Sequence, residues 1–178
     1  MVCTVSIAHG GGGPVLNPDN NHYYELVFSD GANWEQSRDA AAAMSYMGMP
    51  GHLVTIASAA EQTFITSNFS AMPGGAPVFL GGTDEGDEGN WSWITGEPWI
   101  FESWDGGEPD GDGTENCLGT FNSSFNWHDL GCTDRIEDWY IVEYEGQVVP
   151  AIPLPALAGL FAFLILGSFL WLRRRTAD

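Results

Sequence analysis

The sequence predicts an α+β domain of two helices and antiparallel strands, followed by one C-terminal transmembrane helix. Two capping motifs mark helix starts, and short apolar runs between glycine-rich segments indicate strands. An uncharged apolar stretch near the C-terminus is long enough to cross a bilayer. With 178 residues the chain is long enough for one packed domain and a tail, but too short for two ordinary domains.

Two sequences of the capping-box type predict the helices. Asn33 with Gln36 opens a helix over residues 34–47, which the following glycine and proline end. Ser58 with Glu61 opens the second helix, in which three large apolar residues share one face. Glu61 is therefore interpreted as a helix cap and not as a catalytic residue.

The strands are expected on both sides of the helices. One strand precedes them at residues 23–28, and an extended piece follows the first helix at 52–56. A meander of strands follows the second helix, at residues 78–81, 91–94, 117–121 and 139–144. We assign most tryptophans to the core and keep Trp99 and Trp127 as candidates for stacking on a ligand.

Carboxylates accumulate on a glycine-rich loop between tryptophans, in the stretch 91–132. Such segments are too rich in glycine for a regular helix or strand. Ca²⁺ is a hard cation that takes about six to eight oxygen ligands. The sequence therefore predicts a long calcium-binding loop, with charged oxygens from Glu108, Asp110, Asp112, Glu115 and Asp129.

The order of residues in this stretch resembles the long-loop region of C-type lectin-like domains. The matching positions are Trp91, Trp93, Gly96, Pro98, Phe101, Trp104, Gly107, Glu108, Pro109, Glu115, Cys117, Trp127, Asp129 and Cys132. The resemblance covers about residues 23–145 and implies the C-type lectin-like fold for a domain at 21–147. It also implies a cis peptide bond before Pro109 when metal is bound.

The resemblance implies a site in which one Ca²⁺ and the side chains around it bind two neighbouring sugar hydroxyls. By position, this ligand-binding site consists of Glu108, Asp110, Glu115, His128 and Asp129. The Glu-Pro-Asp tripeptide mixes the forms linked to mannose-type and galactose-type sugars, so the sugar stays open. His128 replaces the usual asparagine, and imidazole nitrogen is a poor ligand for Ca²⁺. The alternatives are calcium binding without sugar and a solvated acidic loop.

An upstream acidic segment, TDEGDEGNW, resembles the part of the family that carries auxiliary calcium ligands. It extends the expected metal ligands to Asp84, Glu88, Asp112 and Asn116, with Glu115 shared. Asn116 stands where an acid is common in the family. An exposed polar turn is the alternative, and we assign Glu85 and Asp87 to solvent. Clustered carboxylates repel one another unless a cation neutralises them.

The resemblance also implies a disulfide between Cys117 and Cys132. Closing a loop of about 15 residues gives roughly 3 kcal/mol in the chain-entropy model, and disulfides indicate an oxidising compartment. The second bridge of the family is absent, because an alanine-rich helix and Val142 occupy its two positions. Cys3 is left over, as a free thiol or as part of a removed segment.

The composition limits the partners. The net charge is −19, and the chain has five arginines and no lysine. A nucleic-acid partner is excluded because phosphate binding depends on a basic surface. The acidity fits cation binding and solubility outside the cell. Residues 1–20 form a leader without a complete secretion signal.

The C-terminal segment, residues 148–178, is a separate unit. Residues 151–172 carry no charge and would span about 33 Å as a helix, enough for a bilayer core. Three arginines follow and place the acidic domain outside the cytoplasm by the positive-inside rule. The sequence IPLPA, an apolar span and an arginine cluster resembles a PEP-CTERM sorting signal of the VPLPA type. This implies processing by an exosortase, with a permanent single-pass anchor as the alternative.

We therefore expect a calcium-dependent carbohydrate-binding module, displayed on a bacterial cell surface or in an extracellular matrix that contains exopolysaccharide. The alternative is a structural or protein-interaction module in which calcium only orders the loop. A glycosidase built on Glu108 and Glu115 is disfavoured, because carboxylates held ionised by a metal are poor general acids. The chain is expected to be a binding protein and not an enzyme.

Overall fold

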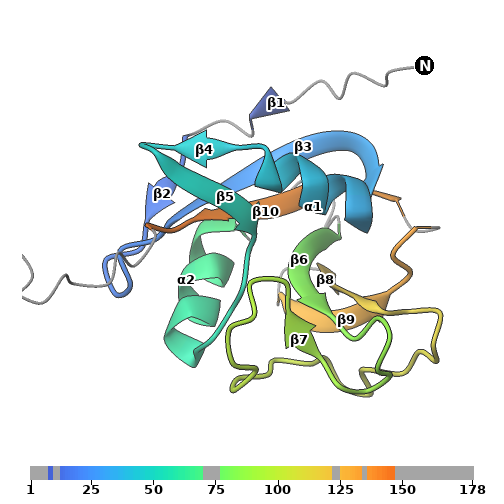
Figure 1. The fold of residues 1–178 in the computed structure, drawn as a ribbon. Coiled ribbons are helices and arrows are strands. Elements are labelled where there is room, and N and C mark those ends of the chain that lie inside the picture. The colour runs from blue at the N-terminus through green and yellow to red at the C-terminus, as the bar shows by residue number, and fades with distance from the viewer. Residues whose placement is uncertain (1–7, 10–12, 70–76, 122–124, 134–135, 147–178) are drawn as a thin grey trace, which may run out of the picture. The chain divides into compact units, whose positions relative to one another are not determined.

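The computed structural model describes residues 8–9, 13–69, 77–121, 125–133 and 136–146. They lie in one compact unit, Met1–Gly146. Figure 1 shows the long strands β3 and β10 crossing the middle of this unit, with β6 to β9 and their long loops gathered below them. The candidate site lies among these loops.

The sheet follows the order β1-β3-β10-β6-β8-β9, with β2 on β3, β5 on β10 and β7 on β6. The strands are β1 Ala8–His9, β2 Val15–Leu16, β3 Tyr23–Asn33, β4 Ser45–Tyr46, β5 Met49–Leu53, β6 Val78–Thr83, β7 Ser92–Trp93, β8 Cys117–Phe121, β9 Asn126–Leu130 and β10 Ile136–Tyr144. β1 and β2 come from the segment interpreted as a leader, and β2 pairs with the start of β3.

The prediction of antiparallel strands alone was wrong at one pair. β10 is antiparallel to β3 but parallel to β6, with Trp139 opposite Val78 and Tyr140 opposite Phe79. β10, the last strand, lies between the early strand β3 and the middle strand β6. These two neighbours run in opposite directions, so β10 is antiparallel to one and parallel to the other. Short apolar strands carry no sequence signal that separates parallel from antiparallel pairing.

Helix α1, Trp34–Ala42, begins at the predicted capping box. Asn33 Oδ1 accepts the Gln36 N–H at 2.9 Å, and the Gln36 side chain accepts the Asn33 N–H at 3.0 Å. The expected extent to residue 47 was wrong. β4 and β5 form a hairpin there, because Met47 and Gly48 both adopt positive φ and make its two-residue turn.

Helix α2, Ala59–Phe69, begins after Ser58, whose hydroxyl accepts the Glu61 N–H at 3.2 Å. The Glu61 carboxylate accepts the N–H of Ala57 at 2.9 Å, one residue before the expected partner. Glu61 is only 8% exposed and also contacts Tyr24 of β3. It therefore caps the helix and joins it to the sheet.

The core explains two features of the sequence. Val142, at one position of the family's missing second bridge, is fully buried in the same apolar cluster as Ala41, which belongs to the alanine-rich helix where the other position falls. Trp127 is 0% exposed and donates its indole N–H to Gln62 at 2.9 Å, so its assignment as a stacking platform was wrong. Trp99 is partly buried and packs against a second core cluster, the one that contains Trp127.

Among the described residues no helix is both long and apolar enough to cross a membrane. The predicted transmembrane segment, residues 151–172, and the arginines after it lie outside the described residues, as does Cys3.

Candidate calcium and ligand site

Strand β9 holds the acidic loop in place through its backbone. The Trp127 N–H donates to the Ser103 carbonyl at 2.8 Å, and the Asp105 N–H donates to the Trp127 carbonyl at 3.0 Å. The loop therefore runs beside β9, and the next turn brings Glu108 over the strand. The peptide bond between Glu108 and Pro109 is cis, as expected.

Glu108, Asp110 and Asp129 form what we call the loop group. Each offers a carboxylate oxygen, and these oxygens lie within 4.8 Å of one another. Asp129 is buried and accepts the N–H of Asp110 at 3.3 Å and of Gly111 at 2.8 Å. The backbone of the loop is therefore folded around the Asp129 carboxylate.

Gly111 leaves the space into which Glu115 reaches. A Cβ at this position would lie 2.6 Å from Glu115 Oε2 and 2.8 Å from Asp129 Oδ2. Two carboxylates thus converge where any side chain would intrude. Five residues were predicted to hold the ion and a sugar. The structure brings four of them together: Glu108, Asp110 and Glu115 lie around Asp129.

The electrostatics of the loop group favour a cation. Burial raises the pKa of the Glu108 carboxyl above its ordinary value, and a hydrogen bond with Asp129 and the charge of Asp110 act in the same direction. His128 opposes them. Crowded carboxylates resist ionisation because their negative charges repel one another. A hard divalent cation stabilises their ionised form. Carboxylate and amide oxygens are the donors that Ca²⁺ prefers, so the residues present fit this ion.

His128 lies beside the loop group, between two carboxylates. Its Nδ1 is 3.0 Å from Glu108 Oε1 and its Nε2 is 3.3 Å from Asp105 Oδ2, while Phe121 packs edge-on against the ring. The imidazole thus orients Glu108. Sequence reasoning missed Asp105, whose pKa is lowered by hydrogen bonds from the Gly106 N–H and Asn126, and by His128. No motif residue marks this position.

A second oxygen-rich site adjoins the loop group. Asp84 is 4% exposed, and its Oδ2 accepts the Gly89 N–H at 2.8 Å. Asp84 Oδ1 and Asn116 Oδ1 are both buried without a hydrogen-bond partner among the described residues. Buried polar atoms are nearly always paired, so two orphaned oxygens indicate a missing ligand. Desolvation and the charges of Asp84, Asp112 and Asp129 raise the pKa of Glu88.

The disulfide between Cys117 and Cys132 is formed, which confirms the prediction. It joins β8 to the segment that follows β9, with a Cα–Cα distance of 5.2 Å. Glu115 and Asn116 immediately precede one cysteine, and Asp129 precedes the other by three residues. The bridge therefore fixes the two segments that carry the expected ligands.

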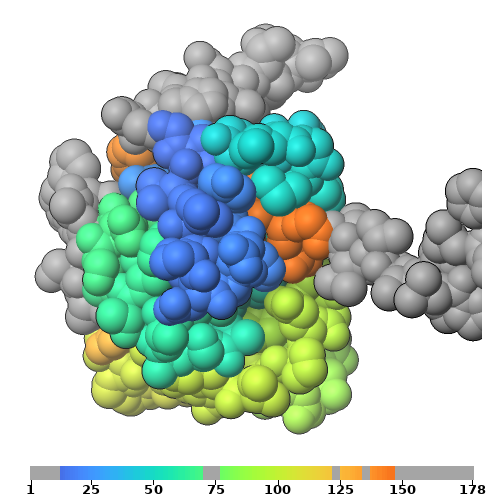
Figure 2. All heavy atoms as spheres, turned by 90° about the vertical axis from the view of Figure 1, so that its left-hand side faces the viewer, coloured from blue at the N-terminus to red at the C-terminus, as the bar shows by residue number. Residues whose placement is uncertain are grey.

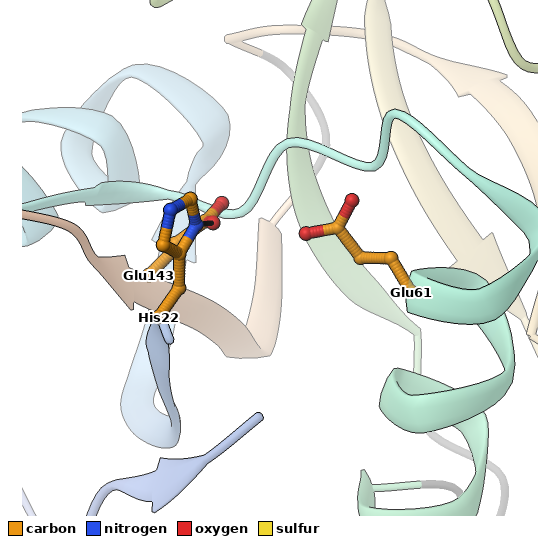
Figure 3. A group of neighbouring side chains, drawn as sticks. All are labelled: His22, Glu61 and Glu143. Atoms are coloured by element: carbon orange, nitrogen blue, oxygen red, sulfur yellow. Dashed lines mark hydrogen bonds and ion pairs between the residues drawn. The ribbon is translucent and has the colours of Figure 1, made fainter. Parts of the chain in front are cut away.

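A separate cluster, which we call the buried group, consists of His22, Glu61 and Glu143. Figure 3 shows the His22 ring beside the Glu143 carboxylate, with Glu61 reaching toward them from α2. Their ligand atoms also lie within 4.8 Å of one another, beside a cavity of about 250 Å³. Tyr24 connects the two glutamates through its hydroxyl, at 2.5 and 3.0 Å.

The comparison with protein families agrees with this geometry. The family model described as "Lectin C-type domain" matches residues 30–137, more than half of the chain. The chain belongs to the C-type lectin family. The structure accordingly has the C-type lectin-like α+β fold with two helices and a mixed sheet.

Curated relatives of this chain match it over part of their length. Halomucin of Haloquadratum walsbyi is 34% identical over 98 residues, which are 55% of this chain and 1% of that protein. Echinoidin of Heliocidaris crassispina is 39% identical over 88 residues, 47% of this chain and 60% of that protein. The match thus spans less than two thirds of either relative.

Solved structures share the fold. The C-type lectin CEL-I from Cucumaria echinata has a TM-score of 0.62 at 22% identity, covering 70% of this chain and 90% of that one. The carbohydrate-recognition domain of the mouse scavenger receptor C-type lectin has a TM-score of 0.58 at 29% identity, covering 72% and 92%. A calcium-independent type II antifreeze protein has a TM-score of 0.60 at 22% identity, covering 78% and 95%.

Proposed function

We propose that this domain binds Ca²⁺ through Glu108, Asp110, Glu115 and Asp129 and uses the site to bind neighbouring hydroxyls of a carbohydrate. The observation that carries the proposal is the loop group, with its carboxylate oxygens within 4.8 Å of one another around a backbone folded onto Asp129. The orphaned oxygens of Asp84 and Asn116 support an auxiliary ion nearby.

The chemistry of the site suits hydroxyl groups. Bound Ca²⁺ would supply open coordination positions for hydroxyl oxygens. Ionised carboxylates only accept hydrogen bonds, so Asp110 and Glu108 can receive the protons of sugar hydroxyls. His128 Nδ1 lies 3.0 Å from Glu108 and holds that acceptor in place. The site is thus rich in acceptors and poor in donors.

The fold alone does not select this function. The structural relatives include a domain described as carbohydrate-recognising and an antifreeze protein described as calcium-independent. The carboxylates gathered in the loop group of this chain favour the first. In the alternative, a structural or protein-interaction module, the same carboxylates would only order the loop.

We also propose that the domain acts outside the cytoplasm. The formed Cys117–Cys132 bridge fits an oxidising compartment. The apolar segment 151–172 and the arginines after it support a membrane anchor or a sorting tail cut by an exosortase, with release to the cell surface or matrix as the result.

A glycan array with the full-length chain in detergent tests the main proposal. Binding in millimolar Ca²⁺ that disappears in chelator is the expected result. Asp129→Asn should abolish it, whereas Glu85→Gln, an equal charge change at an exposed residue, should not. A calcium-dependent rise in melting temperature without glycan binding would favour the interaction module. Identical melting curves in Ca²⁺ and in chelator would reject a calcium site altogether.

A further inference from the structure

The side chain of Asp105 is fixed by hydrogen bonds and yet partly exposed. Its Oδ1 accepts the Gly106 N–H at 2.9 Å and the Asn126 side-chain N–H at 3.1 Å. These bonds, the first more than the second, lower the pKa of the Asp105 carboxyl, so the carboxylate is ionised at neutral pH. Because the side chain is 38% exposed, it presents a fixed negative charge to an approaching ligand. The long loops to which Asp105 belongs are yellow-green in Figure 2 and lie at the lower end of the domain, opposite the cyan β4–β5 hairpin.

One imidazole ring separates Asp105 from the loop group. His128 Nε2 lies 3.3 Å from Asp105 Oδ2, and His128 Nδ1 lies 3.0 Å from Glu108 Oε1. Phe121 packs edge-on against the ring, with the two centroids 4.9 Å apart. Asp105 is not among the carboxylates of the loop group, whose oxygens converge. Its charge therefore stands next to the proposed ion site without being needed as a metal ligand.

The proposed site offers a ligand many acceptors but few donors. Both ring nitrogens of His128 face carboxylates, so in either protonation state its N–H groups are directed at Glu108 or Asp105. The backbone N–H groups of residues 110–111 donate to Asp129. Ionised carboxylates can only accept hydrogen bonds. A ligand that hydrogen-bonds here must therefore supply the protons itself.

Carboxylates also outnumber the positive charges around the proposed ion. They belong to Glu108, Asp110, Glu115, Asp129 and Asp105. Ca²⁺ brings two positive charges, and a protonated His128 would add one. Arg38, the arginine of the described residues, lies on α1 and pairs with Asp39 at 2.8 Å. With calcium bound the site therefore keeps a negative charge, which attracts cations and repels anions.

A ligand with a protonated amine supplies both the donors and the positive charge that the site lacks. We propose that the domain binds an amino sugar with a free amine, whose ammonium group contacts Asp105 while its hydroxyls contact Ca²⁺. This selectivity rests on the proposed function, because it adds a contact to a sugar that calcium holds. An ammonium group has three N–H donors, and its hydrogen bonds to a carboxylate are charge-assisted. N-acetylation removes the charge and all but one donor, so an N-acetylated sugar should bind less well.

A glycan array with the full-length chain in detergent measures this selectivity. The array carries glucosamine, galactosamine and mannosamine, each beside its N-acetylated form and its parent hydroxyl sugar, at pH 6.5, where the amines are protonated. In millimolar Ca²⁺ we expect a free-amine sugar to bind about 10-fold more strongly than its two partners.

Chelator separates binding at the site from nonspecific attraction. The chain has a net charge of −19 and attracts amines without any site. Removing Ca²⁺ makes the chain more negative and strengthens this nonspecific attraction, but it should abolish binding at the site.

Asp105→Asn tests the contact itself. The amide oxygen can still accept from Gly106 and Asn126, but the negative charge is gone. The ratio of free-amine to N-acetyl binding should fall about 10-fold, whereas a merely structural defect would weaken both sugars alike. Asp87→Asn, which removes an equal charge at an exposed residue, is the matched control and should keep the ratio of the parent. The calcium-induced rise in melting temperature serves as the folding control.

The outcomes separate this selectivity from the proposed function. Sugars bound in Ca²⁺ with no preference for the amine, or with the same preference in Asp105→Asn and the parent, would overturn the selectivity and leave carbohydrate binding standing. Amine binding that persists in chelator would overturn it too, as nonspecific attraction. If no sugar binds in Ca²⁺, the proposed function itself fails, and the selectivity with it.

Discussion

The buried group differs from the calcium-loop region, meaning the loop group together with the oxygen-rich site of Asp84 and Asn116 beside it, in how the side-chain oxygens are satisfied. In the buried group every carboxylate oxygen of Glu61 and Glu143 accepts a hydrogen bond from Ala57, Asn20, Thr55, Tyr24 or His22. Around the loop group two buried oxygens, on Asp84 and Asn116, have no partner among the described residues.

This difference predicts which ion, a proton or a metal, each cluster binds from solution. Tyr24 has one hydroxyl proton but contacts two carboxylates, so the buried group is completed by a further proton. Among the described residues, the basic side chain beside the loop group is that of His128, and in our proposal a metal ion completes this group. Acidification should therefore favour the buried group and empty the loop.

Removing the disulfide should have the largest effect on stability. Replacing Cys117 and Cys132 together by alanine frees a loop with a sequence separation of 15 residues and should lower the free energy of unfolding by about 3 kcal/mol. Urea unfolding in chelator measures the loss. Alkylation of both thiols in the unreduced parent would contradict the bridge itself.

Asp129→Asn should weaken Ca²⁺ binding by about 100-fold, because Asp129 holds the loop backbone and, in the proposed site, would also contribute a ligand oxygen. Calorimetry compares the variant with the parent, and Asp87→Asn is the charge-matched control at an exposed position. Equal affinities in the parent and Asp129→Asn would mean that calcium, if bound, lies elsewhere.

Gly111→Ala tests the space between Glu115 and Asp129. The added methyl group would lie within 2.8 Å of both carboxylates and should reduce calcium affinity about 10-fold, or about 1.4 kcal/mol. Gly106→Ala is the control, because a Cβ at Gly106 meets nothing within 4 Å. If both variants bind alike, Gly111 does not shape the site.

Glu61→Gln should have the smallest effect, visible as a change in pH dependence. Burial, followed by the charge of Glu143, raises the pKa of Glu61 above 4.5, despite the opposing hydrogen bond from Tyr24. The folded state then binds the proton more tightly than the unfolded state. The resulting stabilisation is complete below pH 4.5 and is lost as pH rises through the folded pKa.

Thermal unfolding in chelator from pH 4 to pH 8 measures this effect. The melting temperature of Glu61→Gln relative to the parent should increase with pH, since the amide stays neutral. His22, whose pKa is raised mainly by its hydrogen bond to Glu143, shifts the parent in the same direction. A difference that does not vary with pH would show that Glu61 is ionised throughout.

The loop was the most predictable part of the molecule because its residues are close in sequence. Glu108 to Glu115 form one turn-rich segment, and Asp129 follows a fixed tryptophan. The ligand set itself stays a prediction. The disulfide and the capping box of α1 were confirmed for the same reason: each depends on a short, typed spacing.

The buried group could not be predicted, because its residues are 39 to 121 positions apart and meet only through the sheet register. Glu61 resembled an ordinary helix cap, and nothing near His22 marks a partner on β10. The overlong first helix has a similar cause. Alanines favour a helix locally, but the hairpin of β4 and β5 is fixed by pairing with β10.

The tryptophan cluster beneath the loop has a spectroscopic consequence. The indoles of Trp91, Trp93, Trp99, Trp104 and Trp127 lie with ring centroids 4.4 to 6.3 Å apart in neighbouring pairs. Rings this close couple their electronic transitions and give strong near-ultraviolet circular dichroism. Trp127 lies between Asn126 and His128 on β9, and Trp104 directly precedes Asp105. Movement of the loop on metal or sugar binding should thus change the dichroism spectrum without any added label.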